Sequence, residues 1–348
     1  MNITNRISGK EKEFFSVQMA LMLQAGIALP RAIDVVYRQS NNPYFRQILL
    51  SVAKNLQQGQ QLSQALSHFR RSFSVQYLAV LKAGESTGRL DKVFSDLARQ
   101  QKEENSYRSG ILSALIYPTL IIVATILVGI YLVFAVIPSI ADLFVQQNIT
   151  LPLATKILVA IVTFAGKYWY LIILAIIAIV IFLRLFAATA SGKLSLSQLQ
   201  LRLPVLKDLF AASAVTTFCR TLAMLIRYGV PIIEATKIAQ ATQKNILFRG
   251  AADDMLEALE KGLPLSKPIL ENPIYPPLVG QMVMVGEQSG KLDTALDSIA
   301  DHYHDESAII IKNLSALVEP ILIIVVGLGV AYIVYAVLIP IYQIAQIT

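Results

Sequence analysis

Two kinds of segment alternate along the chain: long apolar runs, and stretches in which apolar residues recur among polar ones at helical spacing. A helix needs about 20 mostly apolar residues to cross a bilayer. The runs of suitable length are Ile111 to Ile137, Tyr168 to Leu183 and Leu314 to Tyr342, and the third contains a charged residue, Glu319, near its start. The pattern predicts an all-α integral membrane protein with three transmembrane helices, at 111–138, 168–186 and 314–342.

The polar stretches are two copies of one sequence. Gly26 and Gly229 lie in matching segments 203 residues apart, whereas the Gly-Glu-x-x-Gly segments around Glu85 and Glu287 match at 202, so one insertion or deletion separates the copies. We therefore expect two homologous helical bundles, at 1–110 and 187–313, each long enough for one core. The residues expected to form turns and kinks occupy matched positions: Gly26, Gly84, Gly88, Gly229, Gly286, Gly290, Pro118, Pro138, Pro320 and Pro340.

Glycine and proline divide each copy into short helices. In the first copy, Gly26 suits the left-handed position that ends a helix, and Pro30 suits the first turn of the next one. Ser63 is expected to cap a short fourth helix. Neither glycine nor proline interrupts Leu90 to Ser109, so the sixth helix is expected to continue towards the membrane.

Basic residues set the expected orientation, because cytoplasmic flanks carry an excess of Lys and Arg. Five of them lie between Arg89 and Arg108, whereas the segment at 139–167 holds only Lys156 and Lys167. The N-terminus and the second bundle are therefore expected in the cytoplasm, with a short periplasmic loop at 139–167 and a periplasmic tail at 343–348. Cytoplasmic flanks account for the net charge of +7 without nucleic acid.

The Gly-Glu-x-x-Gly-basic-Leu-Asp segments are the most conspicuous polar motifs. A phosphate-binding loop needs four residues between its glycines and a Ser or Thr after the Lys, and neither segment has this spacing. The first alternative is a structural turn, in which the glutamates satisfy nearby backbone N–H groups and the glycines take unusual backbone angles. The second is a turn that also contacts a partner. The candidate partner-contact residues are Glu85, Arg89, Asp91, Glu287, Lys291, Asp293 and Glu319.

The remaining polar clusters give weaker signals. His302 and His304 do not share a helix face, so a metal site built from the pair is not expected. The acidic clusters Glu103-Glu104 and Asp253-Asp254 with Glu257 suit solvated faces, with a divalent cation between domains as the alternative. Cys219 suits a core position. Because we find no hydrolase triad, zinc pattern or dinucleotide fingerprint, we expect no enzyme activity and no cofactor.

The chain closely resembles the inner-membrane platform family of type II secretion and type IV pilus systems (GspF/PilC-type). The resemblance covers residues 14 to about 342, and it is carried by Gln24-Ala-Gly26-Ile-Ala-Leu-Pro-Arg-Ala, Gly84-Glu-Ser-Thr-Gly88-Arg-Leu-Asp91, Tyr117-Pro118, Arg227-Tyr-Gly229-Val-Pro-Ile, Gly286-Glu-Gln-Ser-Gly290-Lys-Leu-Asp293 and Glu319-Pro320. It implies a multi-pass protein of the bacterial inner membrane with six-helix cytoplasmic bundles, which forms homo-oligomers.

The resemblance also implies partners. A cytoplasmic hexameric ATPase would be coupled through the platform to the insertion of pilin or pseudopilin transmembrane helices, alongside other inner-membrane assembly proteins. Pilus assembly is the first interpretation and the equivalent secretion platform is the alternative. A membrane transporter is a more remote one, because repeats are common in transporters but the spans hold no charge at their middle.

Overall fold

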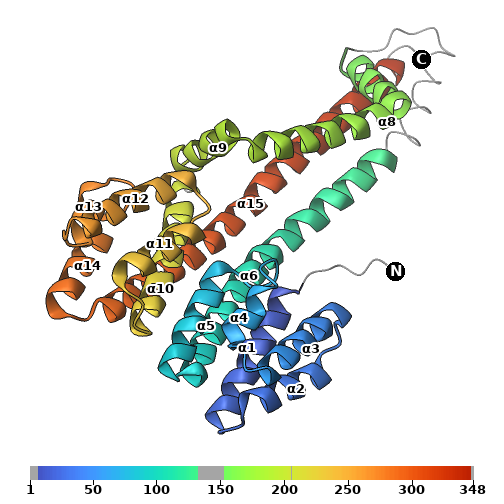
Figure 1. The fold of residues 1–348 in the computed structure, drawn as a ribbon. Helices are drawn as coiled ribbons and strands as arrows, with labels where there is room; N and C mark the ends of the chain where they lie inside the picture. The colour runs from blue at the N-terminus through green and yellow to red at the C-terminus, as the bar shows by residue number, and fades with distance from the viewer. Residues whose placement is uncertain (1–6, 132–152, 205, 346–348) are drawn as a thin grey trace. The chain divides into compact units, whose positions relative to one another are not determined.

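The computed structural model describes residues 7–131, 153–204 and 206–345, and over these residues it contains helices and no strand, which confirms the all-α expectation. The chain divides into two compact units (Figure 1). One unit combines residues 1–109 with 193–310, and the other combines 110–192 with 311–348. The first unit contains both copies of the repeat, so their mutual packing belongs to one compact body.

Each copy of the repeat begins with six helices in the same order. The first bundle consists of α1 (Gly9–Gln24), α2 (Leu29–Gln39), α3 (Pro43–Gln57), α4 (Leu62–Ser67), α5 (Val75–Thr87) and the start of α6 (Leu90–Tyr131). The second bundle consists of α10 (Leu206–Arg227), α11 (Ile232–Thr242), α12 (Ile246–Glu260), α13 (Ser266–Glu271), α14 (Pro277–Ser289) and the start of α15 (Leu292–Ala345).

The helix bounds reproduce the repeat and show in which stretch the two copies differ in length. The bounds of α2 and α11, and those of α3 and α12, are 203 residues apart, whereas those of α5 and α14 are 202 apart. The difference therefore falls between α3 and α5, in the stretch that contains the short helix α4. The glycines also match: Gly26 and Gly229 have φ of 76° and 81°, as expected for residues that end a helix in the left-handed region.

Aromatic side chains form the centre of each bundle. In the first bundle the ring of Phe15 packs edge-on against those of Phe45 and Phe94, with centroids 5.8 and 5.7 Å apart. In the second, Phe248 packs edge-on against Tyr275 at 5.5 Å. Cys219 is 2% exposed, which confirms its expected place in the core. Such ring pairs contribute about 0.5–1.5 kcal/mol each beyond the area they bury.

The sixth helix of each bundle is much longer than the bundle. As expected, α6 continues without interruption from Leu90 into the apolar run, and α15 does the same from Leu292. Pro118 lies inside α6 and does not end it. Because proline lacks an N–H, it removes one backbone hydrogen bond there. The prolines of these two helices therefore do not break them, and the expected kinks remain a prediction.

By length and composition, three helices in the described part of the chain are apolar enough to cross a membrane: Leu90–Gly129, Leu206–Arg227 and Leu292–Tyr332. Ile177–Ala188 and Ser191–Arg202, which meet at 97°, qualify as a fourth if the pair is one span. The Leu206–Arg227 segment is α10, whose apolar stretch is 61% buried inside the protein, so we assign it to the core of the second bundle. The apolar stretches of Leu90–Gly129 and Leu292–Tyr332 are 6% and 0% buried. Large apolar surfaces left open to this extent are typical of lipid-facing helices.

The segment between the two repeats is more helical than expected. Helix α8 (Leu153–Ala188) includes residues 153–167, which the sequence analysis placed in a loop. The two lysines of this stretch interrupt the uncharged run, but its residues are otherwise compatible with a helix. The backbone of Tyr168 departs from helical angles, so α8 bends where the second expected span begins. Helix α9 (Ala190–Arg202) follows directly.

Candidate functional site: the interface between the two bundles

The glutamates of the two repeated motifs form hydrogen bonds inside their own bundles. The Glu85 carboxylate accepts hydrogen bonds from the N–H groups of Leu62 and Ser63 and from the Ser63 hydroxyl. The Glu287 carboxylate accepts from the N–H groups of Leu265, at 2.6 Å, and Ser266, at 3.1 Å. The first turn of a short helix has no internal partners for its N–H groups. Each glutamate therefore caps the fourth helix of its bundle, as the structural interpretation predicted.

The paired glycines of each motif have two different roles. Gly88 and Gly290 both have φ of 68°, in the left-handed region. Gly84 is helical instead, and a Cβ atom there would lie 2.3 Å from Cγ2 of Val93. Gly286 is similarly close to Ala295, at 2.6 Å. The expectation of unusual backbone angles is thus right for the second glycine of each motif and wrong for the first, which lets two helices approach closely.

The basic residues of the motifs are accessible to a partner. The Arg89 and Lys291 side chains are exposed at the turns that join α5 to α6 and α14 to α15. Asp91 is partly buried in the first turn of α6, and Asp293 holds the same place on α15, where it also lies 3.6 Å from Arg227. The motif residues thus separate into internal caps and exposed basic side chains.

A charged cluster that the sequence analysis did not find joins the two bundles. We call it the inter-bundle ion network; it consists of Asp96, Arg99 and Glu103 on α6, Arg220 and Arg227 on α10, and Asp293, Asp297 and Asp301 on α15. Helix α6 belongs to the first repeat, whereas α10 and α15 belong to the second. The contacts of the network between the two repeats therefore join residues more than a hundred positions apart in the sequence, such as Glu103 with Arg220 and Asp96 with Arg227.

Arg220 is the buried centre of this network, with 4% of its surface exposed. Its Nη1 atom lies 2.6 Å from Asp301 and 3.2 Å from Asp297, both on α15. Its Nη2 atom lies 2.9 Å from Glu103 on α6, an ion pair by distance that lacks hydrogen-bond geometry. A buried guanidinium needs such partners because the cost of removing its charge from water is several kcal/mol.

Arg227 forms a second bridge two turns further along the same face of α10. It contacts Asp297 at 2.7 Å and Asp96 at 3.3 Å. The neighbouring Tyr228 hydroxyl donates a hydrogen bond of 2.9 Å to the same Asp96 carboxylate. Asp96 thus receives two contacts from the opposite bundle, and Asp297 is shared among Arg99, Arg220 and Arg227.

These contacts shift the pKa values of Asp297 and Tyr228. Burial alone would raise the pKa of Asp297, but the hydrogen bond from Arg227 and the charges of Arg227, Arg99 and Arg220 outweigh it and lower that pKa. The pKa of Tyr228 is raised, first by burial and then by the Asp96 charge. Asp297 is therefore ionised near neutral pH, and the phenol of Tyr228 is protonated.

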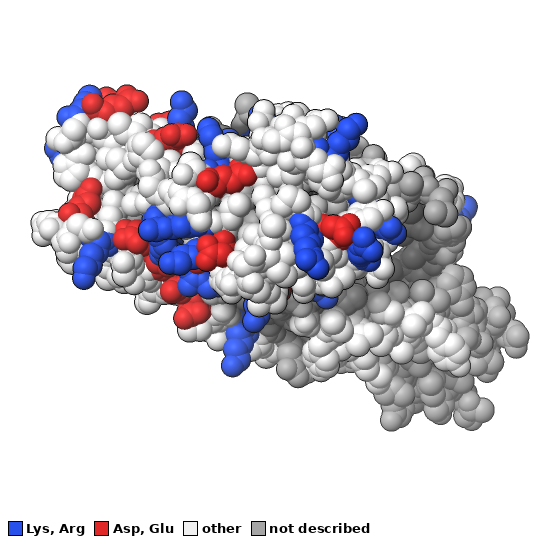
Figure 2. Space-filling view, turned by 60° about the horizontal axis from the view of Figure 1, so that its bottom comes forward, with Lys and Arg blue, Asp and Glu red and all other residues white. Residues whose placement is uncertain are grey.

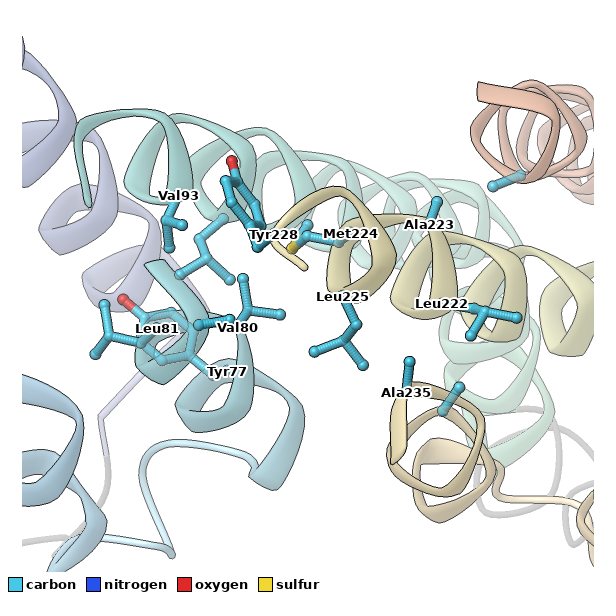
Figure 3. Close-up of a cluster of buried hydrophobic side chains, with 14 of the residues drawn as sticks. Tyr77, Val80, Leu81, Val93, Leu222, Ala223, Met224, Leu225, Tyr228 and Ala235 are labelled. Atoms are coloured by element: carbon cyan, nitrogen blue, oxygen red, sulfur yellow. The ribbon is translucent and has the colours of Figure 1, made fainter. Parts of the chain in front are cut away.

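Apolar side chains complete the interface. Figure 3 shows Tyr77, Val80 and Val93 of the first bundle in one buried cluster with Leu225 and Tyr228 of the second. The helices that meet are α5 with α10 and α11. Because the apolar cluster and the ion network lie on the same pair of bundles, separating them would expose hydrophobic surface and leave the buried Arg220 without Glu103.

Most other sequence-predicted residues lie elsewhere. Asp253 accepts a hydrogen bond from Gln240, and Glu257 pairs with Lys261 on the exposed face of α12. No group of three or more His, Cys, Asp or Glu residues with metal-binding geometry occurs in the described residues. Lys, Arg, Asp and Glu side chains are interspersed over the face shown in Figure 2. The other expected residues are placed as follows: Glu319, Pro320 and Pro340 on α15, and Pro138 outside the described residues.

The geometry defines a class of protein: a duplicated helical bundle whose copies are fastened together and whose last helices continue into apolar segments. The sequence profile of the family "Type II secretion system (T2SS), protein F" matches residues 15–138 and 218–340, one match for each repeat. The chain belongs to this family.

Named relatives support the assignment over nearly the whole chain. The "Type IV pilus assembly protein PilC" of Thermus thermophilus is 34% identical over 96% of this chain and 82% of its own length. The protein of the same name from Myxococcus xanthus is 30% identical over 97% of this chain and 81% of its own. The "Type II secretion system protein F" of Pseudomonas aeruginosa is 28% identical over 98% of this chain and 84% of its own. None of these names denotes an enzyme.

Proposed function

We propose that the chain is an inner-membrane platform of a type IV pilus assembly machine, which couples a cytoplasmic assembly ATPase to the insertion of pilin subunits into the filament. The observation that carries this proposal is that both bundles are fastened together by the inter-bundle ion network while α6 and α15 leave them as uninterrupted apolar helices. The names of the two relatives above that are at least 30% identical to the chain favour the pilus.

The proposal includes a topology. Both bundles lie in the cytoplasm, three spans cross the membrane, and the C-terminus is periplasmic. The basic residues that flank the apolar segments support this orientation. Labelling of single introduced cysteines in intact cells tests it: a cysteine at Arg70 should be protected from an impermeant reagent, and one at Thr348 should react.

The exposed basic side chains of the repeated turns are the proposed contact with the motor. Glu85 and Glu287 accept hydrogen bonds at the starts of α4 and α13, so they are not themselves the contact. They hold in place the turns that expose Arg89 and Lys291. Charge reversal by Arg89→Glu and Lys291→Glu should reduce capture of the ATPase by the full-length platform at least tenfold. Arg70→Glu is the matched control, because Arg70 is exposed on a different connection. Equal capture by all three variants would exclude the turns as the contact.

Glu319 is proposed as the polar contact to a pilin helix. It lies near the start of the apolar part of α15, where an ionisable group next to lipid is costly and usually has a function. We expect Glu319→Gln to lower filament number without changing the amount of platform in the membrane. Unchanged piliation would remove Glu319 from the mechanism.

The secretion platform is the alternative, supported by the relative named type II secretion system protein F. Deletion and complementation in the source organism separate the two functions. Loss of surface pili with normal export supports the pilus assignment, and loss of export with normal pili supports the alternative. A deletion strain that keeps both would overturn the platform proposal.

A further inference from the structure

The contact between the two bundles uses different surfaces on the two copies. The first bundle contributes α5 and α6, whereas the second contributes α10 and α11 and, through Asp297, one residue of α15. In the repeat, α10 and α11 correspond to α1 and α2, and α14 and α15 correspond to α5 and α6. The interface is therefore head to tail between two homologous domains, and every bundle carries one version of each surface.

Two of the four surfaces lack the equivalent contact in the part of the chain that the structure describes. They are the α1–α2 surface of the first bundle and, in the second, the surface formed by α14 and the face of α15 that carries Ser298. Asp297, elsewhere on α15, does contact Arg99 of the first bundle. The first corresponds to the surface that the second bundle uses, and the second corresponds to the surface that the first bundle uses. A heterologous contact of this kind can be repeated between molecules.

Exposure at equivalent positions separates the used surfaces from the unused ones. Met224 on α10 is 2% exposed, and its equivalent Leu21 on α1 is 56% exposed. Ala83 on α5 is 7% exposed, and its equivalent Val285 on α14 is 61% exposed. Leu278, also on α14, is 40% exposed.

Three apolar residues of α14 lie on one face of the helix. Leu278, Met282 and Val285 recur at i, i+4 and i+7. Leu278 and Val285 are exposed, whereas Met282 is partly buried and packs against the core. Gln76 on α5, the equivalent of Leu278, is 8% exposed. The second bundle thus exposes apolar side chains at positions that are buried in the first bundle.

We propose that a second copy of this chain covers these surfaces, with the α1–α2 surface of one molecule docked on α14 and the start of α15 of its neighbour. The contact copies the one between the two bundles of a single chain. Each molecule then has one donor and one acceptor surface, so the same contact generates a closed ring, or an open row if the rotation does not close.

The intermolecular contact differs from the internal one in charge. The equivalents of Arg220 and Arg227 are Val17 and Gln24, and the equivalent of Asp96 is Ser298. Both arginines that α10 contributes to the network are therefore absent from the contact between molecules, whereas Asp305 keeps the negative charge of its equivalent Glu103. The two bundles of one chain are tethered covalently, which raises their effective concentration. The copies can therefore associate and separate while each chain keeps its two bundles joined.

Crosslinking tests the head-to-tail register directly. In the internal contact Arg227 lies 3.3 Å from Asp96, so their equivalents Gln24 and Ser298, both exposed, should face one another across neighbouring molecules. Full-length Gln24→Cys and Ser298→Cys chains with different tags are co-expressed and treated in membranes with a short bis-maleimide. Cys219 is buried, and the wild-type chain provides the background.

The expected product contains both tags, whereas each variant expressed alone gives only the wild-type background. Crosslinks between two Gln24→Cys chains, or between two Ser298→Cys chains, would show a two-fold contact and overturn the proposal. Absence of the mixed product would overturn it as well.

Substitution on each surface provides an independent measurement. Leu21→Glu and Val285→Glu should each weaken self-association of the purified full-length protein at least tenfold, measured by dilution in detergent with light scattering. The matched control is Leu50→Glu, because Leu50 is 51% exposed and belongs to α3, which is part of neither surface. Equal self-association of the three variants would contradict the proposal, provided that their helix content matches the wild type.

This inference refines the self-association that the proposed function includes, and the two can fail separately. Loss of the mixed crosslink would leave capture of the ATPase through Arg89 and Lys291 untouched. Failure of that capture would leave the crosslinked pair in place.

Discussion

Replacing Arg220 by methionine removes the buried centre of the inter-bundle ion network. Methionine keeps much of the length of the side chain, so the change mainly removes charge and hydrogen bonds. Breaking a buried ion pair by removing one partner typically costs about 3–5 kcal/mol, because the other charge stays buried and unpaired. The structure decides how much of this cost applies here.

The three carboxylates around Arg220 differ in how much stabilisation they lose when the arginine is replaced. Asp301 has a side chain that is 57% exposed and would be solvated, so its loss is small. Asp297 is 18% exposed but keeps Arg227, at 2.7 Å. Glu103, whose side chain is 27% exposed, loses its ion pair with Arg220. We therefore expect a destabilisation below the full range, about 2–3 kcal/mol after allowing for solvent screening.

Thermal unfolding of the full-length protein in detergent measures this effect. For a unit of about 150–250 residues, 1 kcal/mol shifts the Tm by about 2–4 °C, so Arg220→Met should lower it by about 5–10 °C. The matched control is Arg38→Met, which breaks an exposed pair with Asp34 whose side chains are 76% and 51% exposed. Such a pair contributes about 0.3–0.5 kcal/mol, and the shift should be about 1–2 °C.

The comparison can refute the reasoning. Equal shifts in Arg220→Met and Arg38→Met would show that Arg220 is not stabilised by buried partners. Adding Glu103→Leu to Arg220→Met should recover part of the loss, because an apolar replacement no longer leaves a carboxylate without its cation. A further fall in the Tm of the double variant would contradict the assigned pairing.

Three further predictions concern single features of the first unit. Gly84→Ala should destabilise the protein by about 1–3 kcal/mol through overpacking against Val93. Gly110→Ala should not, because nothing lies within 4 Å of the new Cβ. Equal shifts of the two variants in thermal unfolding would contradict the close approach of α5 and α6 at Gly84. Glu85→Gln should speed amide hydrogen exchange at the start of α4, and unchanged exchange would contradict the cap. The folded-state pKa of Asp297 is lowered, so its stabilisation is present above the ordinary value of 3.8 and is lost as the pH falls below it. The Tm difference between wild type and Asp297→Asn should therefore shrink below pH 3.8. A difference that stays constant with pH would contradict the shift.

Repetition made much of the fold predictable from sequence. Gly26 and Gly229 identified the end of the first helix in each copy, and the change of offset between the copies anticipated a single length difference. The absence of glycine and proline after Leu90 predicted the continuous α6. These inferences depend on local backbone preferences, which the sequence records directly.

The ion network could not be predicted in the same way. The first copy has Val17 and Gln24 at the positions of the two arginines of α10. A comparison of the repeats therefore does not single out Arg220 and Arg227 as matched residues. Their partners on α6 are more than a hundred positions away, and no local spacing brings them together. A charged residue within the apolar pattern of α10 was the available signal, since a buried arginine requires acidic partners.

The asymmetry of the repeats has a mechanical meaning under the proposed function. The two arginines that α10 contributes to the ion network occur only in the second copy, and the two bundles of one chain are tethered covalently. The contact between molecules is therefore the one that separates first under load. Helices α6 and α15 both carry residues of the network. A load that separates neighbouring molecules would thus leave α6 and α15 of each chain joined through their bundles.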